Sequence, residues 1–432
     1  MLTLSASAAA EIDAAIRDAV ADPHRGLPRA VVMATSKEGL LYSGSGGFAQ
    51  LPEFGAPASA FESAERISTT SVFELWSMTK LVSVVAALQM VEQGKLDLQA
   101  DASLYVPALK NVKILESFDG EKPVLVDKKT VVTVEMLITH TAGFGYDHNI
   151  PIQAKYRKLN GLPANAGIDA DTASITKIPL AKEPGSVWIY GTSNDWLALC
   201  VEAVSGQGID EYFQEHIFDL LGMNDFSFKS DGKNKINMAY IPSNPEDPYI
   251  VGPGVTWNFK RGFGGHGLVG SPESYLKLVR ALLCGGEVDG KRILAGDTVQ
   301  QMFLPHLNDA QQAGCDPFTR KRDLAEYEAN GPGPQWGLGG ALTQVDLPSG
   351  RRAGSLNWSG MAATYWVIDP TTEVAFGVPL ASCKYRLDEA DMFLYLLVIF
   401  TNVMPGATGS PQQIWDLFEK VEVALYRGLS VE

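Results

Sequence analysis

The strand-forming segments of this chain lie at its two ends, and this split limits the possible folds more than any other feature. Residues 29–35 and 40–45 are apolar, β-rich runs around Lys37-Glu38-Gly39, a pattern typical of a hairpin. After about residue 335, turn signals such as Asp369-Pro370 separate further short strands, predicted at 340–347, 352–358, 362–368 and 373–380. The two ends are therefore predicted to build one antiparallel sheet.

Helical patterns accompany both ends and fill the middle. Residues 8–20 and 411–427 have amphipathic spacing, and residues 77–93 form a long apolar helix that Gly94 would end. Two more helices are predicted at 133–139, with Thr133 as N-cap, and after Ser271-Pro272. We expect a single α/β unit over 1–432, in which an antiparallel sheet is flanked by helices. Its α/β subdomain would comprise about 1–76 and 265–432, and a mostly helical subdomain about 77–264.

Composition narrows the possible partners and the location. The formal net charge is −15, and phosphate binding needs clustered Lys and Arg, so no nucleic-acid partner is expected. The four cysteines are far apart, which favours reduced thiols over a disulfide framework: Cys200, Cys284, Cys315 and Cys383. Residues 1–20 lack the basic segment of a secretory signal, and no apolar run approaches the ~20 residues of a membrane helix. A cytoplasmic protein without a membrane partner is predicted.

The catalytic motif that fits best is Ser-x-x-Lys, which on its own is a weak pattern. The sequence has no G-x-S-x-G, no H-E-x-x-H, no His/Cys ligand cluster and no phosphate-binding loop, so neither a metal nor a cofactor is expected. The Ser-x-x-Lys spacing occurs at Ser77–Lys80, Ser174–Lys177, Ser230–Lys233 and Ser274–Lys277. Only Ser77 stands at the entry of a long apolar helix, so context selects this copy.

The position of Ser77 suits a nucleophile. Residues three apart share a helix face, so Lys80 would lie beside Ser77 and accept its proton. The helix N-terminus would favour negative charge that develops near the serine. The alternative is structural: an N-cap serine followed by a lysine whose stem lies along apolar surface.

Two further segments place candidate groups near this pair. Trp188-Ile189-Tyr190 follows the Pro184-Gly185 turn and precedes a helix near Asp195, so the hydroxyl of Tyr190 can point into a cleft. In Asn357-Trp358-Ser359-Gly360-Met361, a glycine within a strand indicates close approach by a ligand or another backbone. The alternatives are a tyrosine that fills the core and a glycine that serves packing or a bulge.

Taken in order, these segments resemble the serine β-lactamase/penicillin-binding-protein superfamily over nearly the whole chain. The resemblance is closest to the branch with class C β-lactamases, family VIII carboxylesterases and fungal transesterases of the statin side-chain acyltransferase type. It rests on five segments: Ser77-Met78-Thr79-Lys80, Leu137 to Gly143, Trp188-Ile189-Tyr190-Gly191 with Asp195-Trp196, Gly264-Gly265-His266-Gly267-Leu268, and Ser355 to Gly360. The implied fold is β-lactamase/DD-peptidase-like.

The resemblance also implies roles for single residues. Ser77 would attack an acyl carbonyl while Lys80 and Tyr190 handle its proton, and which of the two is the base stays open. Backbone N–H groups of Ser77 and Met361 would form the oxyanion hole. The predicted substrate-binding residues are Trp188, Trp358, Ser359 and Gly360. Three nearby histidines, His140, His148 and His266, are interpreted as structural.

Two departures from the antibiotic-handling members bear on the substrate. Those members have a lysine at the start of the third motif, where this chain has Trp358. Their Tyr-x-Asn is here Tyr190-Gly191-Thr192. Both differences argue against a role with β-lactams or peptidoglycan and favour the esterase and transesterase branch.

The leading hypothesis is acyl transfer from a thioester or ester donor to an alcohol of a small-molecule natural product. An acyl carrier protein or a CoA thioester is the candidate donor partner. The first alternative is a carboxylesterase that uses water as acceptor. The second is a non-catalytic binding protein on the same fold, because a fold does not fix function.

Overall fold

The two ends of the chain do form one antiparallel sheet, as predicted. The computed structural model describes residues 2–146, 150–162, 175–229, 235–240, 247–252, 262–315, 335–362, 364–377, 381–382, 395–396, 403–404 and 412–431. Its main sheet has seven strands in the order β12-β13-β14-β15-β16-β2-β3, and all neighbours are antiparallel. The strands are β2 Arg29–Ser36, β3 Leu40–Gly47, β12 Gln335–Trp336, β13 Ala341–Leu342, β14 Leu356–Gly360, β15 Thr364–Asp369 and β16 Val374–Gly377.

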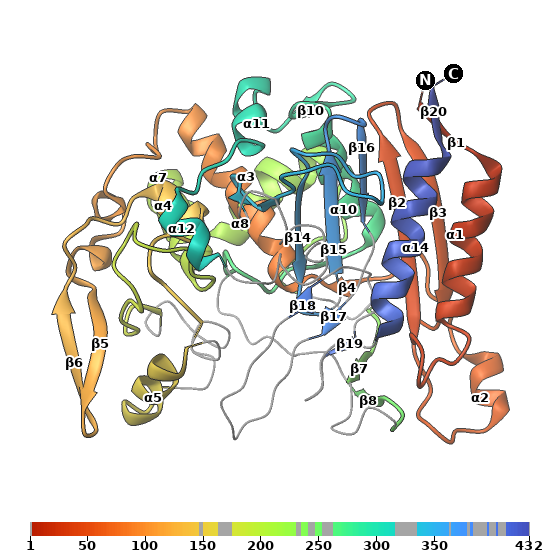
Figure 1. Cartoon of the computed structure of the whole chain (residues 1–432), viewed down its shortest axis with the longest axis horizontal. Coiled ribbons are helices and arrows are strands. Elements are labelled where there is room, and N and C mark those ends of the chain that lie inside the picture. Colours follow the sequence, from red (N-terminus) through yellow and green to blue (C-terminus); the bar gives the residue numbers. More distant parts are fainter. Residues whose placement is uncertain are drawn as a thin grey trace.

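The join between the two ends lies in the sheet interior, where β16 pairs with β2 and Val374 faces Ser36. In Figure 1 the red and blue ends of the chain lie side by side at this junction. Strand β2 is buried along its whole length, which requires cover on both faces of the sheet. The strand pairing therefore depends on helices packed on each side.

Alternate residues of β2 enter two different cores, as the period of a strand demands. Ala30, Val32 and Ala34 pack with helices α1 Ala6–Ala19 and α14 Gln412–Gly428 on one face. Val31 and Met33 enter the larger core on the other face, where α10 Pro272–Leu283 crosses β2 and β16. Figure 1 shows α1 and α14 together at the right of the molecule.

The larger core is built around α3, Thr79–Glu92, which is buried from its first residue through Met90. Helix α7, Ser193–Ser205, packs against α3, and α4, Val134–Ile138, packs against α7. A helix that is apolar all round belongs in the interior, and here it carries the predicted nucleophile segment into the centre of the protein.

The remaining elements complete the fold around this core. The helices and helical turns are α2 Ala58–Ser63, 3₁₀ turns Trp76–Met78, Ala102–Leu104 and Pro107–Asn111, α5 Pro151–Leu159, α8 Ile209–Phe213, a π turn Gln214–Phe218, α9 Asp219–Leu221, α11 Gly296–Met302 and α12 Asp309–Gly314. The strands are β1 Leu2–Leu4, β4 Phe73–Glu74, β5 Lys113–Asp119, β6 Lys122–Asp127, β7 Met238–Tyr240, β8 Ile250–Gly252, β9 Val269–Gly270, β10 Glu287–Val288, β11 Lys291–Arg292, β17 Ala381–Ser382, β18 Tyr395–Leu396, β19 Val403–Met404 and β20 Leu429–Val431.

Most predicted element positions are confirmed, with corrections at their ends. The Thr133 side chain caps α4 by accepting from the N–H of Met136, and Ser271 caps α10 through Ser274. The helix predicted from residue 77 begins with a 3₁₀ turn, and its α-helical part starts at Thr79. The strand predicted over 340–347 is limited to Ala341–Leu342. The strand predicted over 373–380 is observed as Val374–Gly377, and residues 378–380 lie outside the described part.

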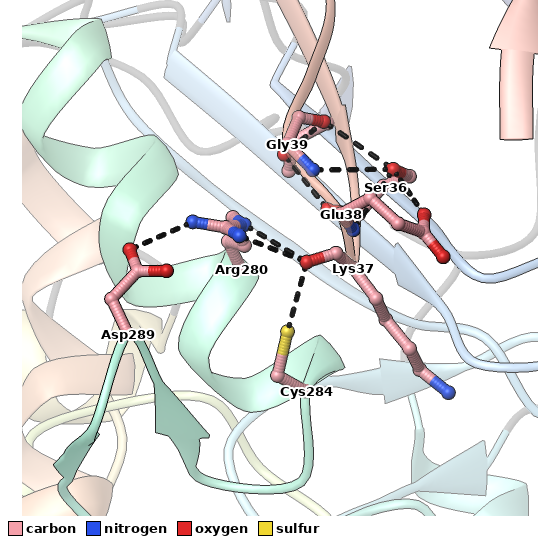
Figure 2. Close-up of polar contacts among 8 residues, drawn as sticks. Ser36, Lys37, Glu38, Gly39, Arg280, Cys284 and Asp289 are labelled. Carbon is pink, nitrogen blue, oxygen red and sulfur yellow. Dashed lines mark hydrogen bonds and ion pairs between the residues drawn. The ribbon is translucent and has the colours of Figure 1, made fainter. Parts of the chain in front are cut away.

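A tight turn between β2 and β3 fixes α10 against the sheet (Figure 2). The carbonyl of Lys37 accepts hydrogen bonds from Arg280 Nε at 3.2 Å and Nη2 at 2.9 Å, and from Cys284 Sγ at 3.6 Å. One turn from the start of α10, the hydroxyl of Tyr275 donates to the carbonyl of Met78 at 3.1 Å. Helix α10 thereby connects the hairpin to the chain segment that follows Ser77.

The described residues also allow a search for membrane-spanning helices, metal sites and paired cysteines. Among them no helix is long and apolar enough to cross a membrane, and no group of three or more His, Cys, Asp or Glu could hold a metal ion. Cys200 and Cys284 are free thiols, Cys315 is buried, and Cys383 lies outside the described residues. The subdomain boundaries at 76/77 and 264/265 stay a prediction.

Candidate active site

Ser77 is the single opening in an otherwise buried stretch. Every other residue from 71 to 90 is buried, and Ser77 is partly exposed. It lies in the 3₁₀ turn before α3, directly after Trp76, whose φ is +48°. A bulky residue rarely adopts this left-handed conformation, and such strain concentrates at functional sites. The backbone therefore presents the Ser77 hydroxyl outward from the end of a buried helix.

Lys80 lies beside Ser77, as the spacing predicted, and is 2% exposed. Its Nζ donates to Ser77 Oγ at 3.1 Å, to the Tyr146 hydroxyl at 3.1 Å and to the carbonyl of Gly265 at 2.8 Å. An ammonium group has three N–H donors, and these acceptors match that number. The alternative of a lysine stem that lies along surface is inconsistent with this burial.

The segment 264–268 is fixed to two helices and supplies one of these acceptors. The Ser83 hydroxyl of α3 donates to the carbonyl of Gly264 at 2.6 Å, and the N–H of Gly265 donates to Asp195 Oδ1 of α7 at 2.7 Å. A Cβ on Gly264 would lie 1.9 Å from the carbonyl oxygen of Asn194. The glycines of this motif are thus required by close backbone approach, which places the Gly265 carbonyl against Lys80.

Tyr190 stands over Lys80 inside a group of aromatic rings. The Lys80 ammonium lies 4.8 Å from the centre of the Tyr190 ring, and Tyr190 is 8% exposed. The indole Nε1 of Trp358 donates to the Tyr190 hydroxyl at 3.1 Å. The Tyr190 segment is held by the N–H of Ile189, which donates to the carbonyl of His140 at 2.8 Å. A tyrosine that only fills the core would not meet a cation and an indole N–H together.

Tyr146 is a site residue that the sequence analysis missed. Besides its contact with Lys80, its ring lies 5.5 Å from that of Tyr190. A Cβ on Gly191 would lie 2.3 Å from the carbonyl oxygen of Phe144, so glycine there lets the two tyrosine segments meet. The available signal was its place three residues after Gly143, at the end of the Leu137 to Gly143 segment.

The third predicted segment reaches the nucleophile from the sheet. A Cβ on Gly360, the last residue of β14, would lie 2.1 Å from the carbonyl oxygen of Leu75. The Thr364 hydroxyl donates to that same carbonyl at 3.2 Å. Met361 follows Gly360 in the turn and packs with Trp76. The end of β14 therefore adjoins the Ser77 turn, which is the arrangement that an oxyanion hole shared by Ser77 and Met361 needs.

With this geometry established, comparison with known proteins identifies the family. Residues 12–398 match the family described as Beta-lactamase. The chain belongs to this family. The predicted resemblance and the β-lactamase/DD-peptidase-like fold are confirmed.

Several relatives of this beta-lactamase family member are named as acyltransferases or as an esterase. A lovastatin esterase of Penicillium rubens is 34% identical over 69% of this chain and 76% of its own. A monacolin J acid methylbutanoyltransferase of Aspergillus terreus is 30% identical over 85% of this chain and 90% of its own. The solved LovD6 mutant of the simvastatin synthase of A. terreus has a TM-score of 0.79 at 26% identity, covering 98% of both chains. These relatives confirm the predicted enzyme class, a serine acyltransferase or carboxylesterase.

All four predicted substrate-binding residues are buried. Trp188, Trp358 and Ser359 are 2%, 4% and 1% exposed. The rings of Trp188 and Trp336 lie 5.3 Å apart, and those of Trp336 and Trp358 lie 4.5 Å apart. These indoles form an aromatic wall behind Tyr190 (we call Trp188, Trp336 and Trp358 the indole wall). The role of Trp188, Trp358, Ser359 and Gly360 toward substrate stays a prediction.

The histidines near the site differ in their surroundings. His140 is fully buried with its ring 4.7 Å from that of Tyr190, and burial together with the charge of Lys80 holds its pKa well below the ordinary value. A neutral imidazole there adds no second cation next to Lys80. His266 is also buried and stacks on Phe263 with ring centres 5.4 Å apart. His148 lies outside the described residues.

Proposed function

We propose that this protein transfers an acyl group from a thioester or ester donor to an alcohol of a small-molecule natural product, through an acyl-enzyme on Ser77. The observation that carries the proposal is the contact of a buried Lys80 with the partly exposed hydroxyl of Ser77 in the turn that leads into its helix. The relatives support the direction of the chemistry, since several are named acyltransferases. One is named for methylbutanoyl transfer to monacolin J acid, so a short branched acyl group is the first donor to test.

Acylation follows from the positions of three groups. Ser77 Oγ bonds to the acyl carbon while its proton passes to the Tyr190–Lys80 pair. The oxyanion of the tetrahedral intermediate is held by the N–H groups of Ser77 and Met361. When the bond to the leaving oxygen or sulfur breaks, the pair returns the proton to the leaving alcohol or thiol. In the second half, the acceptor hydroxyl gives its proton to the same pair and attacks the acyl carbon, and Ser77 regains a proton as it leaves.

The hydrogen bonds of Lys80 favour Tyr190 as the group that receives the proton. A carbonyl oxygen can only accept, so the Gly265 carbonyl always takes one N–H of Lys80. With three acceptors around Nζ, the ammonium form has every N–H engaged and no lone pair to offer Ser77. The lysine then orients Ser77 Oγ, and the Tyr190 oxygen accepts. The two groups act as a coupled pair, so the assignment describes one proton shared between them.

Hydrolysis is the second candidate function, and a specific relative favours it. The lovastatin esterase is 34% identical to this chain. In the hydrolytic reaction, this chain would form the same acyl-enzyme on Ser77, and water would then attack it in place of the alcohol. The difference between the two functions lies in access of water to the acyl-enzyme. An acyl carrier protein or a CoA thioester is proposed as donor only for the transferase.

Intact-protein mass spectrometry separates the two candidates. The protein is mixed with p-nitrophenyl butyrate or with a short branched acyl thioester, with and without an acceptor alcohol such as a statin core with a free hydroxyl. A Ser77-linked adduct that persists in water and is discharged by the alcohol supports transfer. An adduct that water clears at the same rate with or without alcohol identifies an esterase, and no adduct on folded protein refutes both.

A further inference from the structure

We propose that Trp358 is a positioning residue for proton transfer, because its indole N–H holds the oxygen of Tyr190 and stabilises that oxygen when it carries negative charge. The inference rests on the proposed function. It gives a role to the residue that stands where antibiotic-handling relatives have a lysine. It also differs from the predicted role of Trp358 in substrate binding, because the effect passes through Tyr190.

The direction of the hydrogen bond is fixed by chemistry. An indole nitrogen is a donor only, so in the 3.1 Å contact between Trp358 Nε1 and the Tyr190 hydroxyl the tyrosine oxygen must accept. Both side chains are at least nine-tenths buried, with exposed fractions of 4% and 8%. A donor aimed at an oxygen in a site shielded from water favours the charged form of that oxygen over the neutral form.

The rigid sheet sets the position of this donor. Trp358 lies in the middle of β14 and pairs across the sheet with Trp366 of β15. Its ring meets that of Trp336 edge to face, with centres 4.5 Å apart at an angle of 76°. Tyr190 belongs to a segment that is neither helix nor strand, so its hydroxyl needs an external support. Trp358 supplies that support from the sheet.

The charge of the donor matters as well. The ammonium of Lys80 already lies 4.8 Å from the Tyr190 ring centre. A second cation in the place of Trp358 would repel Lys80, whereas an indole N–H favours a negative oxygen without adding charge. The site can thus stabilise a deprotonated Tyr190 without placing a second cation beside the uncharged ester or thioester group that reacts.

The indole wall contains its own control. Trp188 Nε1 and Trp336 Nε1 are buried and have no hydrogen-bond partner among the described residues. Trp358 and Trp336 lie in contact in the same aromatic group, yet only Trp358 donates to Tyr190. If Trp358 acted by packing alone, replacement of either tryptophan by phenylalanine would have a similar effect.

The test compares Trp358→Phe with Trp336→Phe. Both substitutions remove one indole N–H and the same side-chain volume. For each variant, kcat/KM for an acyl thioester is measured as a function of pH by mass spectrometry of quenched samples. In Trp358→Phe we expect the acid limb of the profile to move to higher pH by about one to two pH units, the scale of a lost hydrogen bond to a charged group. At pH values above the shifted limb the rate recovers most of the loss. In Trp336→Phe the limb stays in place.

Two results would overturn the inference. One is a Trp358→Phe profile that drops equally at every pH, which means packing only; the other is an equal shift in both variants. If Trp358→Phe does not fold, benzothienylalanine at position 358 replaces the N–H by sulfur in a ring of nearly the same shape, and its profile decides the question by the same criteria. Formation of the Ser77 adduct in the unmodified protein is scored separately, so failure of the proposed function is recognised independently.

Discussion

The substitution Gly360→Ala tests whether the close approach of β14 to the Ser77 turn is needed for catalysis. A Cβ at position 360 would lie 2.1 Å from the carbonyl oxygen of Leu75 and 2.3 Å from Thr364 Oγ1. Ordinary contact begins at 3.4 Å, so the strand and the turn must separate by about 1.3 Å. The threonine side chain can rotate away, but the Leu75 carbonyl belongs to the backbone that leads directly to Ser77.

The size of the effect follows from this displacement. Met361 comes immediately after Gly360, so its N–H moves relative to Ser77. A shift of about 1 Å in a catalytic arrangement costs on the order of 10²-fold in rate, which is also the lower end of the loss for one oxyanion donor. Overpacking at a backbone contact costs about 1–3 kcal/mol in the free energy of unfolding. We therefore expect slow acylation in a protein that is less stable but still folded.

The assay measures the rate of Ser77 acylation by quenched-flow mass spectrometry, together with denaturant unfolding. Gly296→Ala is the matched control, because the nearest atom to its new Cβ would be 3.8 Å away and Gly296 has no positive φ. This control should acylate normally and be as stable as the unmodified protein or slightly more stable. Acylation of Gly360→Ala at the unmodified rate would show that the approach of β14 to the turn plays no part in catalysis.

Three further predictions address single groups. Ser77→Ala should give no acyl adduct and keep its fold, because water can replace the lost acceptor at this partly exposed position. Tyr190→Phe should lose about two to four orders of magnitude in kcat/KM, and a near-normal rate would contradict its assigned role. Burial opposes the charge of His306, but its hydrogen bonds to Glu135 and the Gln301 carbonyl prevail and raise the pKa of His306 above the ordinary value. The stabilisation that the His306–Glu135 pair gives the folded state is therefore present below about pH 6.5 and is lost as pH rises through the folded-state pKa of His306. We expect His306→Ala to lose more unfolding free energy at pH 6 than at pH 8. An equal loss at both pH values would refute the ion pair.

Local patterns in the sequence were sufficient to predict the main elements. The alternation of β2 residues between two cores and the caps at Thr133 and Ser271 depend only on neighbouring residues and on the period of each element. The short extent of β13 was missed, because it depends on where the chain turns rather than on strand propensity. Directly after β13, the N–H of Thr343 donates to the carbonyl of Ser355 at 2.9 Å and the N–H of Gly354 donates to the carbonyl of Thr343 at 2.8 Å, which closes the connection to β14.

The polar contacts of the site were harder to predict from the sequence, because they join residues far apart in the chain. Lys80 and Tyr146 are separated by 66 positions, and Tyr190 and Trp358 by 168. The contact between Ser77 and Lys80 could be predicted because both residues lie on one helical segment. The position of Tyr146 depends on the contact between Gly191 and Phe144, which no local pattern encodes. Single motifs were thus predictable, whereas their pairing required the folded structure.

The surroundings of Lys80 explain why these separate motifs act as one unit. The acceptors around Lys80 among the described residues are a serine hydroxyl, a tyrosine hydroxyl and a backbone carbonyl, and none of these three groups is a carboxylate. A buried ammonium without an anion is unfavourable, so in the proposed mechanism Lys80 and Tyr190 act as one pair that shares a proton. In the proposed mechanism, the N–H of Trp358 favours the form of this pair in which Tyr190 is negative, and that form accepts the proton of Ser77. A neutral indole in the third motif therefore supports the charge separation that the nucleophile requires.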